Sequence, residues 1–320
     1  MSSNPQLSPD ADTELPDSTG LRLLAVHAHP DDEASKGAAM MAAYVHAGAR
    51  VMVATATDGS QGDIINPHYG ESVRVDRDIT AVRFQEMAES ARILEIEHRW
   101  LGFRDSGYPE GDDPMANLEP GCFADLPLED AAAPLVRLIR EFKPHVLVTY
   151  DEIGGYPHPD HLRTHAISME AYEKSGDPDA YPGTGEPWEI SKLYYDRAFN
   201  PDKFKAVHKA LLDNGYESPY AKRIEWYDRV AAGEDDPDAW RLTHHEVTTQ
   251  VHAAAYLEYR DAALRAHRSQ VDSHGMFFFT PNEIIRKHWP WEDYVLIDSK
   301  VPTTLPESDL FAGLRDTTVE

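Results

Sequence analysis

The sequence has almost no cysteine, since Cys122 is the single thiol among 320 residues. An intrachain disulfide is therefore excluded, and a reducing compartment such as the cytoplasm is favoured. Cys122 lies in the stretch EPGCFADLP with no histidine near it in sequence. We interpret it as a small packed residue rather than a nucleophile.

Long apolar segments and basic charge are also scarce. No apolar run approaches the roughly 18 residues of a transmembrane helix. The chain carries 30 basic and 56 acidic residues, a formal net charge of -26. Such a surface repels nucleic acid and anionic membranes, so neither is an expected partner. Residues 1–20 are polar and acidic without the regions of a signal peptide, and we predict a disordered leader there.

Apolar strand patterns alternate with helical patterns over the first two thirds of the chain. The predicted strands are residues 21–26, 50–57, 98–103, 145–150 and 192–199. The predicted helices between them are residues 34–47, 76–94, 128–142 and 161–174. This repetition predicts an α/β fold with a Rossmann-like, doubly wound, mostly parallel sheet over residues 21–200.

Residues 201–320 have a weaker pattern. Helices are expected at 201–214 and 253–270, and strands at 245–251 and 294–298. We predict that this part forms a smaller α+β lobe that caps and completes the pocket. It is either a separate lobe or continuous with the core.

Two similar clusters carry the chemistry: His29-Pro30-Asp31-Asp32 and His158-Pro159-Asp160-His161. Each follows an apolar strand, and ligands of open α/β sheets bind outside the carboxyl ends of the strands. If the two strands are neighbours in the sheet, the clusters meet. Either cluster alone has an ordinary alternative as a polar surface loop, because the chain has 16 histidines and 56 acidic residues.

Together the clusters fit a catalytic metal site. A hydrolytic Zn²⁺ takes three protein ligands from histidine and carboxylate side chains and keeps one position open. One carboxylate must stay off the metal to act as a general base, and the first cluster supplies an aspartate for each task. Zn²⁺ is the expected ion, with Fe²⁺ as the alternative that the same donors accept.

The motif VHAHPDDE at 26–33, paired with GGYPHPDH at 154–161, resembles the LmbE/PIG-L-like zinc deacetylases. Those enzymes remove acyl groups from N-acylated glucosamine derivatives. The segments GDIINP (62–67), LGFRDSG (101–107), LRAHRSQ (264–270) and VPTTLPESDLF (301–311) are similar to the branch that acts in mycothiol metabolism. The resemblance runs from about Leu21 to the end of the chain.

The resemblance implies a role for each matching residue. It implies His29, Asp32 and His161 as zinc ligands and Asp31 as the general base. His158 would stabilise the intermediate or protonate the leaving amine, Tyr156 would polarise the carbonyl, and Asp160 would orient His158. The residues implied in substrate binding are Lys36, Arg83, Asp105 and Asp63. Lys36 and Arg83 have surface charges on helices as their alternatives.

The resemblance also implies a reaction. It favours an amidase that cleaves the cysteinyl–glucosamine amide of mycothiol S-conjugates, a small-molecule thiol-conjugate substrate, into a mercapturic acid and glucosaminyl-inositol. The alternatives are a deacetylase of N-acetylglucosaminyl-inositol, an amidase of secondary metabolism, and a non-catalytic sugar-binding module. The sequence leaves monomer and homo-oligomer equally open.

Overall fold

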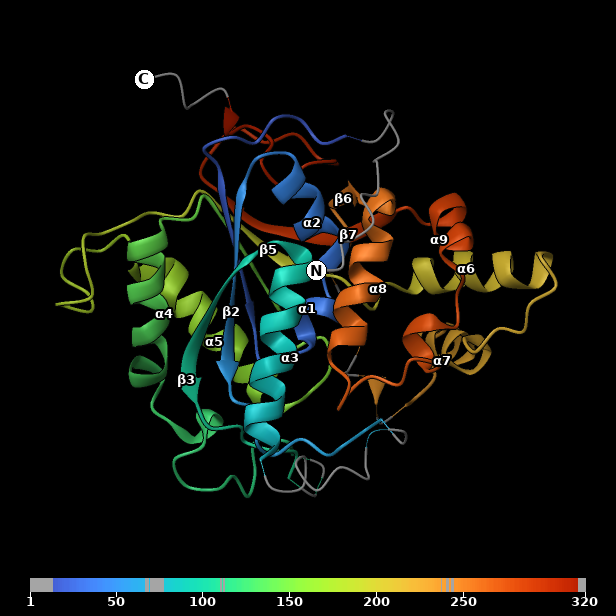
Figure 1. The fold of residues 1–320 in the computed structure, drawn as a ribbon, viewed down its shortest axis with the longest axis horizontal. Coiled ribbons are helices and arrows are strands. Elements are labelled where there is room, and N and C mark those ends of the chain that lie inside the picture. Colours follow the sequence, from blue (N-terminus) through green and yellow to red (C-terminus); the bar gives the residue numbers. More distant parts are fainter. Residues whose placement is uncertain are drawn as a thin grey trace, which may run out of the picture.

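The computed structural model of the chain describes residues 14–66, 69, 78–109, 111, 113–236, 238–239, 242 and 245–315. Within these residues the strands form one seven-stranded sheet in the order β3-β2-β1-β4-β5-β7-β6 (Figure 1). The strands are β1 (Arg22–His27), β2 (Arg50–Thr57), β3 (Glu97–Phe103), β4 (Val146–Thr149), β5 (Lys192–Asp196), β6 (Thr249–His252) and β7 (Trp291–Ser299).

Helices connect and cover these strands. The α-helices are α1 (Asp32–Ser35), α2 (Ala38–His46), α3 (Ile79–Leu94), α4 (Leu128–Phe142), α5 (Pro159–Lys174), α6 (Pro201–Asp213), α7 (Ala221–Ala231), α8 (Leu257–Ala266) and α9 (Asn282–His288). Short 3₁₀ helices are η1 (Phe123–Asp125), η3 (Ala254–Tyr256) and η4 (Met276–Phe278).

The central strands are buried on both faces, which explains their continuous apolar runs. Side chains of β1 alternate between the faces: Leu23 and Ala25 join one apolar core, and Leu24 and Val26 join the other. The first core is built with α2, α3 and α8, and the second with α4 and α5 (Figure 1). The sheet is therefore the middle layer of three.

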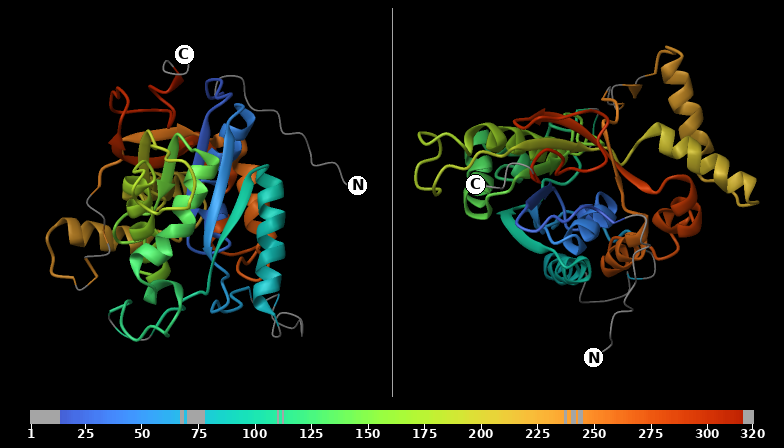
Figure 2. Two further views of the ribbon diagram at one scale, coloured as in Figure 1. Left: turned by 90° about the vertical axis from the view of Figure 1, so that its left-hand side faces the viewer. Right: turned by 90° about the horizontal axis from the view of Figure 1, so that it is seen from above.

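The predicted α/β class is confirmed, with a parallel core of β3, β2, β1, β4 and β5. The last two strands add to the same sheet in antiparallel orientation, β7 against β5 and β6 against β7. The later part of the chain thus extends the sheet itself. Helices α6 and α7 project from the sheet layers (Figure 2).

Three differences from the predicted elements have local causes. The single helix expected at 34–47 is divided into α1 and α2, because Lys36 is extended and Gly37 takes a left-handed φ of 90°. The helix expected at 253–270 ends at Ala266. Helices α7 and α9 are absent from the predictions, since α7 is strongly polar and α9 has only 7 residues.

Most of the predicted leader, residues 1–13, lies outside the described residues. The next residues contact the domain: Ser18 is buried, and its backbone N–H donates to Ala47 O at 2.7 Å. Among the described helices, none has the length and apolar character needed to cross a bilayer.

Candidate metal and catalytic site

The two histidine–aspartate clusters meet at the carboxyl ends of β1 and β4, which are neighbouring parallel strands. The chain proceeds from β1 to β2 on one side, whereas β4 lies on the other side of β1. This reversal is a topological switch point, where an open α/β sheet leaves a crevice for ligands. The first cluster spans the turn from β1 into α1, and the second begins α5 with His158 at its N-cap.

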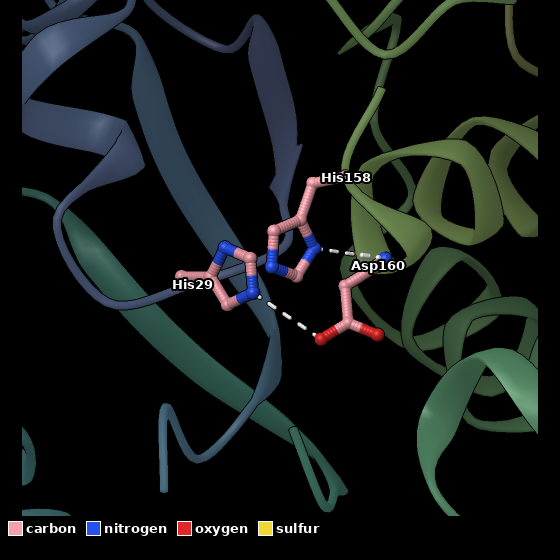
Figure 3. A group of neighbouring side chains, drawn as sticks. All are labelled: His29, His158 and Asp160. Atoms are coloured by element: carbon pink, nitrogen blue, oxygen red, sulfur yellow. Dashed lines mark hydrogen bonds and ion pairs between the residues drawn. The ribbon is translucent and has the colours of Figure 1, made fainter. Parts of the chain in front are cut away.

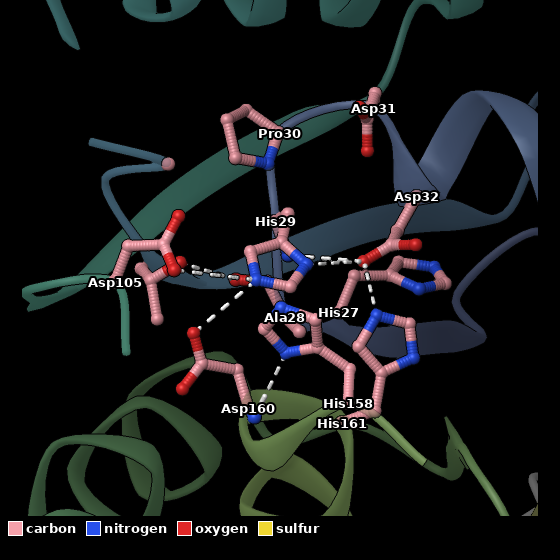
Figure 4. A network of polar contacts seen from close by, with 12 residues as sticks. His27, Ala28, His29, Pro30, Asp31, Asp32, Asp105, His158, Asp160 and His161 are labelled. Carbon is pink, nitrogen blue, oxygen red and sulfur yellow. Dashed lines mark hydrogen bonds and ion pairs between the residues drawn. The ribbon is translucent and has the colours of Figure 1, made fainter. Parts of the chain in front are cut away.

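Within the described part of the chain, two groups of side chains have donor atoms close enough to hold one metal ion. One group is His29, Asp32 and His161, and the other is His29, His158 and Asp160; in each, the donor atoms lie within 4.8 Å of one another. Figure 4 shows both groups converging on His29. The metal ligands implied by the resemblance are the first group.

His161 has the contacts of a metal ligand. Its Nδ1 lies 2.9 Å from Gly154 O, and its buried Nε2 has no hydrogen-bond partner among the described residues. An N–H at Nδ1 bonded to a carbonyl fixes the tautomer that leaves Nε2 as a lone-pair donor. That nitrogen is 3.4 Å from Asp32 Oδ2, and burial lowers the pKa of His161, so the ring is neutral. These residues therefore fit a divalent metal.

Asp32 is prepared as an anionic ligand. Its Oδ2 accepts hydrogen bonds from Tyr150 Oη at 2.8 Å and from the His29 backbone N–H at 3.0 Å. Its Oδ1 pairs with the Lys36 ammonium. Burial works to raise the pKa of Asp32, but the Lys36 ammonium holds it well below its usual range. The carboxylate is consequently ionised, as metal binding requires.

The second group is already occupied by internal hydrogen bonds (Figure 3). Asp160 Oδ2 accepts from the Ser106 backbone N–H at 3.0 Å and lies 3.2 Å from His29 Nε2. His158 Nδ1 accepts the Asp160 backbone N–H at 3.1 Å. Burial lowers the pKa of His29, but its hydrogen bonds to Asp160 and Asp32 outweigh this and raise it to about 10. Surroundings that favour a proton on His29 this strongly also favour a metal cation.

Asp31 lies beside the ligands in an unusual backbone conformation, with φ of 145°. Its Oδ2 accepts from Arg83 Nη2 at 3.1 Å, and about a quarter of its side chain is exposed. Burial raises the pKa of Asp31, and Arg83 opposes the rise. An aspartate that is accessible and oriented but not bound within the ligand group suits a general base.

His158 and Tyr156 face the same site from the second cluster. Burial lowers the pKa of His158 to about 2, and the positive charge of His29 adds to the effect. The ring is therefore neutral, and because Nδ1 is an acceptor, its proton is on Nε2. Tyr156 is partly exposed and its ring centroid lies 4.4 Å from that of His161. Burial raises the pKa of Tyr156, which keeps its hydroxyl as a donor.

Two of the residues expected to bind substrate, Lys36 and Arg83, are buried and contact other protein groups. Lys36 is only 8% exposed, and its ammonium contacts Asp32 rather than facing outward. Arg83 is 3% exposed and donates to Gly59 O and Pro30 O as well as to Asp31. The alternative interpretation of both as surface charges is wrong, because both are buried.

The other residues to which the resemblance gives a role are Asp105, Asp63 and Asp160. Asp105 is buried and accepts the Gly107 backbone N–H at 2.8 Å, and its Oδ1 lies 3.8 Å from His29 Nε2. Asp63 is exposed. Asp160 contacts His158 through its backbone N–H and His29 through its carboxylate.

Three residues of the site were not identified from the sequence. Tyr150 follows β4 directly, so its position at a strand end beside the clusters was the available signal. Glu33 and His267 lie within the quoted motifs VHAHPDDE and LRAHRSQ, but neither motif assigned them a role. In the structure His267 Nε2 lies 2.6 Å from Glu33 Oε1. A contact between residues 234 positions apart has no signal in local sequence patterns.

Comparisons with known proteins agree on one family. Residues 24–172 match the family described as PIG-L: GlcNAc-PI de-N-acetylase. The chain is 48% identical over 298 residues to a mycothiol S-conjugate amidase of Streptomyces coelicolor, with 92% of this chain and 98% of the relative covered. It is 39% identical over 315 residues to a 1D-myo-inositol 2-acetamido-2-deoxy-alpha-D-glucopyranoside deacetylase of Thermobispora bispora, with 92% and 98% covered.

A solved structure supports the fold. An N,N'-diacetylchitobiose deacetylase from Pyrococcus horikoshii superposes with a TM-score of 0.54 at 19% identity, covering 86% of this chain and 83% of that one. At this identity the likeness concerns the architecture alone.

Proposed function

The chain belongs to the PIG-L/LmbE family and is a hydrolase of C–N amide bonds, and we propose that it is a zinc-dependent amidase of mycothiol S-conjugates. The proposed reaction adds water across the cysteinyl–glucosamine amide. It releases a mercapturic acid, which carries the new carboxylate, and glucosaminyl-inositol, which carries the freed amine.

One observation carries the choice of substrate: the 48% identity to a mycothiol S-conjugate amidase over nearly the full length of both chains. The second candidate is the deacetylase of N-acetylglucosaminyl-inositol, supported by the 39% identity to such an enzyme over a similar span. Both reactions hydrolyse an amide on the same glucosamine nitrogen. A single site of this design serves either, so the two differ in the acyl group that the pocket accepts.

We propose His29, Asp32 and His161 as the residues that hold the zinc ion. Fe²⁺ is the alternative ion for these donors. The support is the orphaned Nε2 of His161, the ionised Asp32 carboxylate, and the proximity of the three donor atoms. When bound, zinc acts as a Lewis acid that polarises the amide carbonyl and acidifies the attacking water.

The chain's own groups manage the protons. Asp31, held by Arg83, accepts a proton from the water as it attacks the carbonyl carbon. The Tyr156 hydroxyl donates to the carbonyl oxygen as negative charge develops there. When the C–N bond breaks, the amine nitrogen needs a proton. Asp31 returns to it the proton that it took from the water, while His158, whose Nδ1 is engaged by the Asp160 backbone N–H, donates a hydrogen bond from Nε2 to the reacting amide.

The residues proposed for substrate contact are divided by exposure. Asp63 is exposed and available to a sugar or inositol hydroxyl. Asp105 is close to His29 and reaches the same crevice. Arg83 and Lys36 are buried and act through other residues, because Arg83 orients Asp31 and Lys36 orients Asp32. A cytoplasmic location is part of the proposal, since the substrate is a thiol conjugate of the cell interior and the chain has a single cysteine.

The test is a direct comparison of kcat/KM on a mycothiol S-conjugate and on N-acetylglucosaminyl-inositol, with one zinc-loaded preparation. We expect the S-conjugate to be preferred by at least about tenfold, which corresponds to about 1.4 kcal/mol in transition-state binding. Preference for the acetylated sugar would replace the proposal with the deacetylase. No hydrolysis of either would reject both substrates.

A further inference from the structure

We infer that His267 and Glu33 form a buried positioning pair that fixes the backbone of Asp31. The inference rests on the proposed function, in which Asp31 is the general base. It assigns a purpose to two residues that lie outside the metal group and make no contact with the crevice.

The need for such a pair comes from the conformation of Asp31. Its φ of 145° with ψ of −20° is a region that residues other than glycine rarely adopt. Strained conformations of this kind persist only where surrounding contacts over-determine them, and they cluster at active sites. Some set of contacts must therefore hold the peptide on each side of Asp31.

Glu33 supplies one of those contacts. Its Oε2 accepts the backbone N–H of Asp31 at 3.0 Å, which fixes the peptide between Pro30 and Asp31. Its Oε1 accepts from Ser90 Oγ at 2.5 Å and lies 2.6 Å from His267 Nε2. Both carboxylate oxygens are thus engaged, and the side chains of Glu33 and His267 are fully buried. Without its partners this carboxylate would be a costly buried charge free to rotate away from Asp31.

One face of α3 organises the whole arrangement. Arg83, Glu86 and Ser90 are spaced i, i+3 and i+7, so they lie along the same side of the helix. Arg83 holds the Asp31 carboxylate and Pro30 O, whereas Ser90 holds Glu33. Glu86 holds the segment that carries His267, because its carboxylate accepts the Ser269 backbone N–H at 2.8 Å and the Ser269 hydroxyl at 2.7 Å.

The contacts of His267 explain why it suits this position. It follows the last residue of α8 and is fixed by the packing of α8 against α3. Its Nε2 contacts Glu33 Oε1 directly, at 2.6 Å. Arg83 therefore controls the side chain of Asp31, and the His267–Glu33 pair controls its backbone. Loss of the pair should misplace the base while leaving the ligands His29 and His161 in position.

The experiment compares His267→Leu, which removes the donor, with His267→Gln, whose amide nitrogen replaces Nε2. Zinc content and steady-state kinetics are measured on the zinc-loaded enzyme with the preferred amide substrate. We expect His267→Leu to keep one zinc per chain and a KM within about threefold of wild type, and to lose about 10²-fold in kcat, because small misplacements of a reacting group cost this much. His267→Gln should restore most of the rate.

Tyr44→Phe is the matched control, since it removes a hydrogen bond of similar burial, from Tyr44 Oη to Asp309 Oδ1 at 2.8 Å, without touching the Asp31 peptide or the segment that carries His267. It should keep kcat within about threefold of wild type, a change of under about 1 kcal/mol. An equal loss of kcat in Tyr44→Phe and His267→Leu would mean general loosening and would overturn the inference. If His267→Leu fails to fold, Ser90→Ala removes the other donor to Glu33 Oε1 and should lower kcat with KM unchanged.

A crystal structure of zinc-loaded His267→Leu, or of Ser90→Ala in its place, separates this inference from the proposed function. We expect φ of Asp31 to leave its left-handed value. An Asp31 that keeps φ near 145° in the variant overturns the positioning role, whatever the rates are. Wild-type enzyme without amidase activity would instead reject the proposed function, and the φ angle would still decide the role of the pair.

Discussion

The ring of Tyr150 stacks on the ring of His161, with centroids 4.4 Å apart and planes 7° from parallel. The same tyrosine donates its hydroxyl hydrogen to Asp32 Oδ2 at 2.8 Å, and the hydroxyl oxygen accepts the Ala28 backbone N–H at 2.9 Å. One residue at the end of β4 thus orients two proposed ligands from different clusters. Such outer contacts tune the affinity of a metal site.

Removing only the hydroxyl should therefore weaken zinc binding. We expect Tyr150→Phe to retain the stack on His161 and to lower zinc affinity by about 10–100-fold, as loss of an outer-shell partner does elsewhere. Competition with a chelator of known affinity measures it. Tyr195→Phe is the control, because Tyr195 is buried in β5 and its hydroxyl donates to the sulfur of Met169 rather than to a proposed ligand. Equal zinc affinities in the two variants would count against the role of Tyr150.

Replacing the proposed base should separate catalysis from metal binding. We expect Asp31→Asn to keep one zinc per chain and to lose about 10²–10⁴-fold in kcat, because the amide cannot accept the proton of the attacking water. Asparagine tolerates positive φ, so the backbone is not the cause of the loss. Metal analysis and kinetics on the same sample check this. Turnover like that of wild type in the fully metallated variant would rule out Asp31 as the base.

The two histidines of the second cluster should differ in what they lose. His161→Gln should lose stoichiometric zinc, because the orphaned Nε2 is the proposed ligand. His158→Gln should retain zinc and lose turnover, because its ring nitrogens serve the Asp160 N–H and the reacting amide. Elemental analysis after dialysis against buffer with trace zinc distinguishes them. The reverse pattern would assign the metal to His158.

A pair of adjacent glycines tests how tightly His161 is held. Gly154 and Gly155 both have left-handed φ, 71° and 69°. A Cβ on Gly154 would lie 2.6 Å from His161 Cβ, whereas a Cβ on Gly155 would lie 3.8 Å from its nearest neighbour, Phe199. Both alanine variants should pay about 1–2 kcal/mol for the conformation.

Of the two variants, we expect only Gly154→Ala to lose zinc affinity in addition to stability, since the added methyl group displaces His161. Thermal unfolding with and without zinc provides the measurement. The difference between the two melting temperatures should shrink in Gly154→Ala and stay as in wild type in Gly155→Ala. A normal zinc-dependent stabilisation of Gly154→Ala would mean that His161 adapts, and the rigid placement described above would be wrong.

The layered fold was predictable because β1, β2, β4 and α4 have strong local signals. The three strands are apolar on both faces, and the limits of β2 and α4 match the predicted ranges. The clusters at the strand ends were visible for the same reason. The break at Gly37 was missed because the small apolar residues around it favour one continuous helix.

The site residues that the sequence did not reveal are those that act through long-range contacts. Tyr150 and His267 act on Asp32 and Glu33 across more than a hundred residues of chain, so no spacing rule connects them. The resemblance implies substrate contact for Lys36 and Arg83, and local sequence does not show how either side chain packs. In the structure both are buried and each pairs with an aspartate, Lys36 with Asp32 and Arg83 with Asp31.

The most direct test of the account is the position of the metal itself. Crystals of the zinc-loaded enzyme, measured at wavelengths on both sides of the zinc absorption edge, give an anomalous difference map that locates the ion. We predict one strong peak bounded by His29, Asp32 and His161, with Asp31 and His158 beside it but not bound to it. A sole peak between His29, His158 and Asp160 would contradict the ligand set and, with it, the division of labour between His158 and His161.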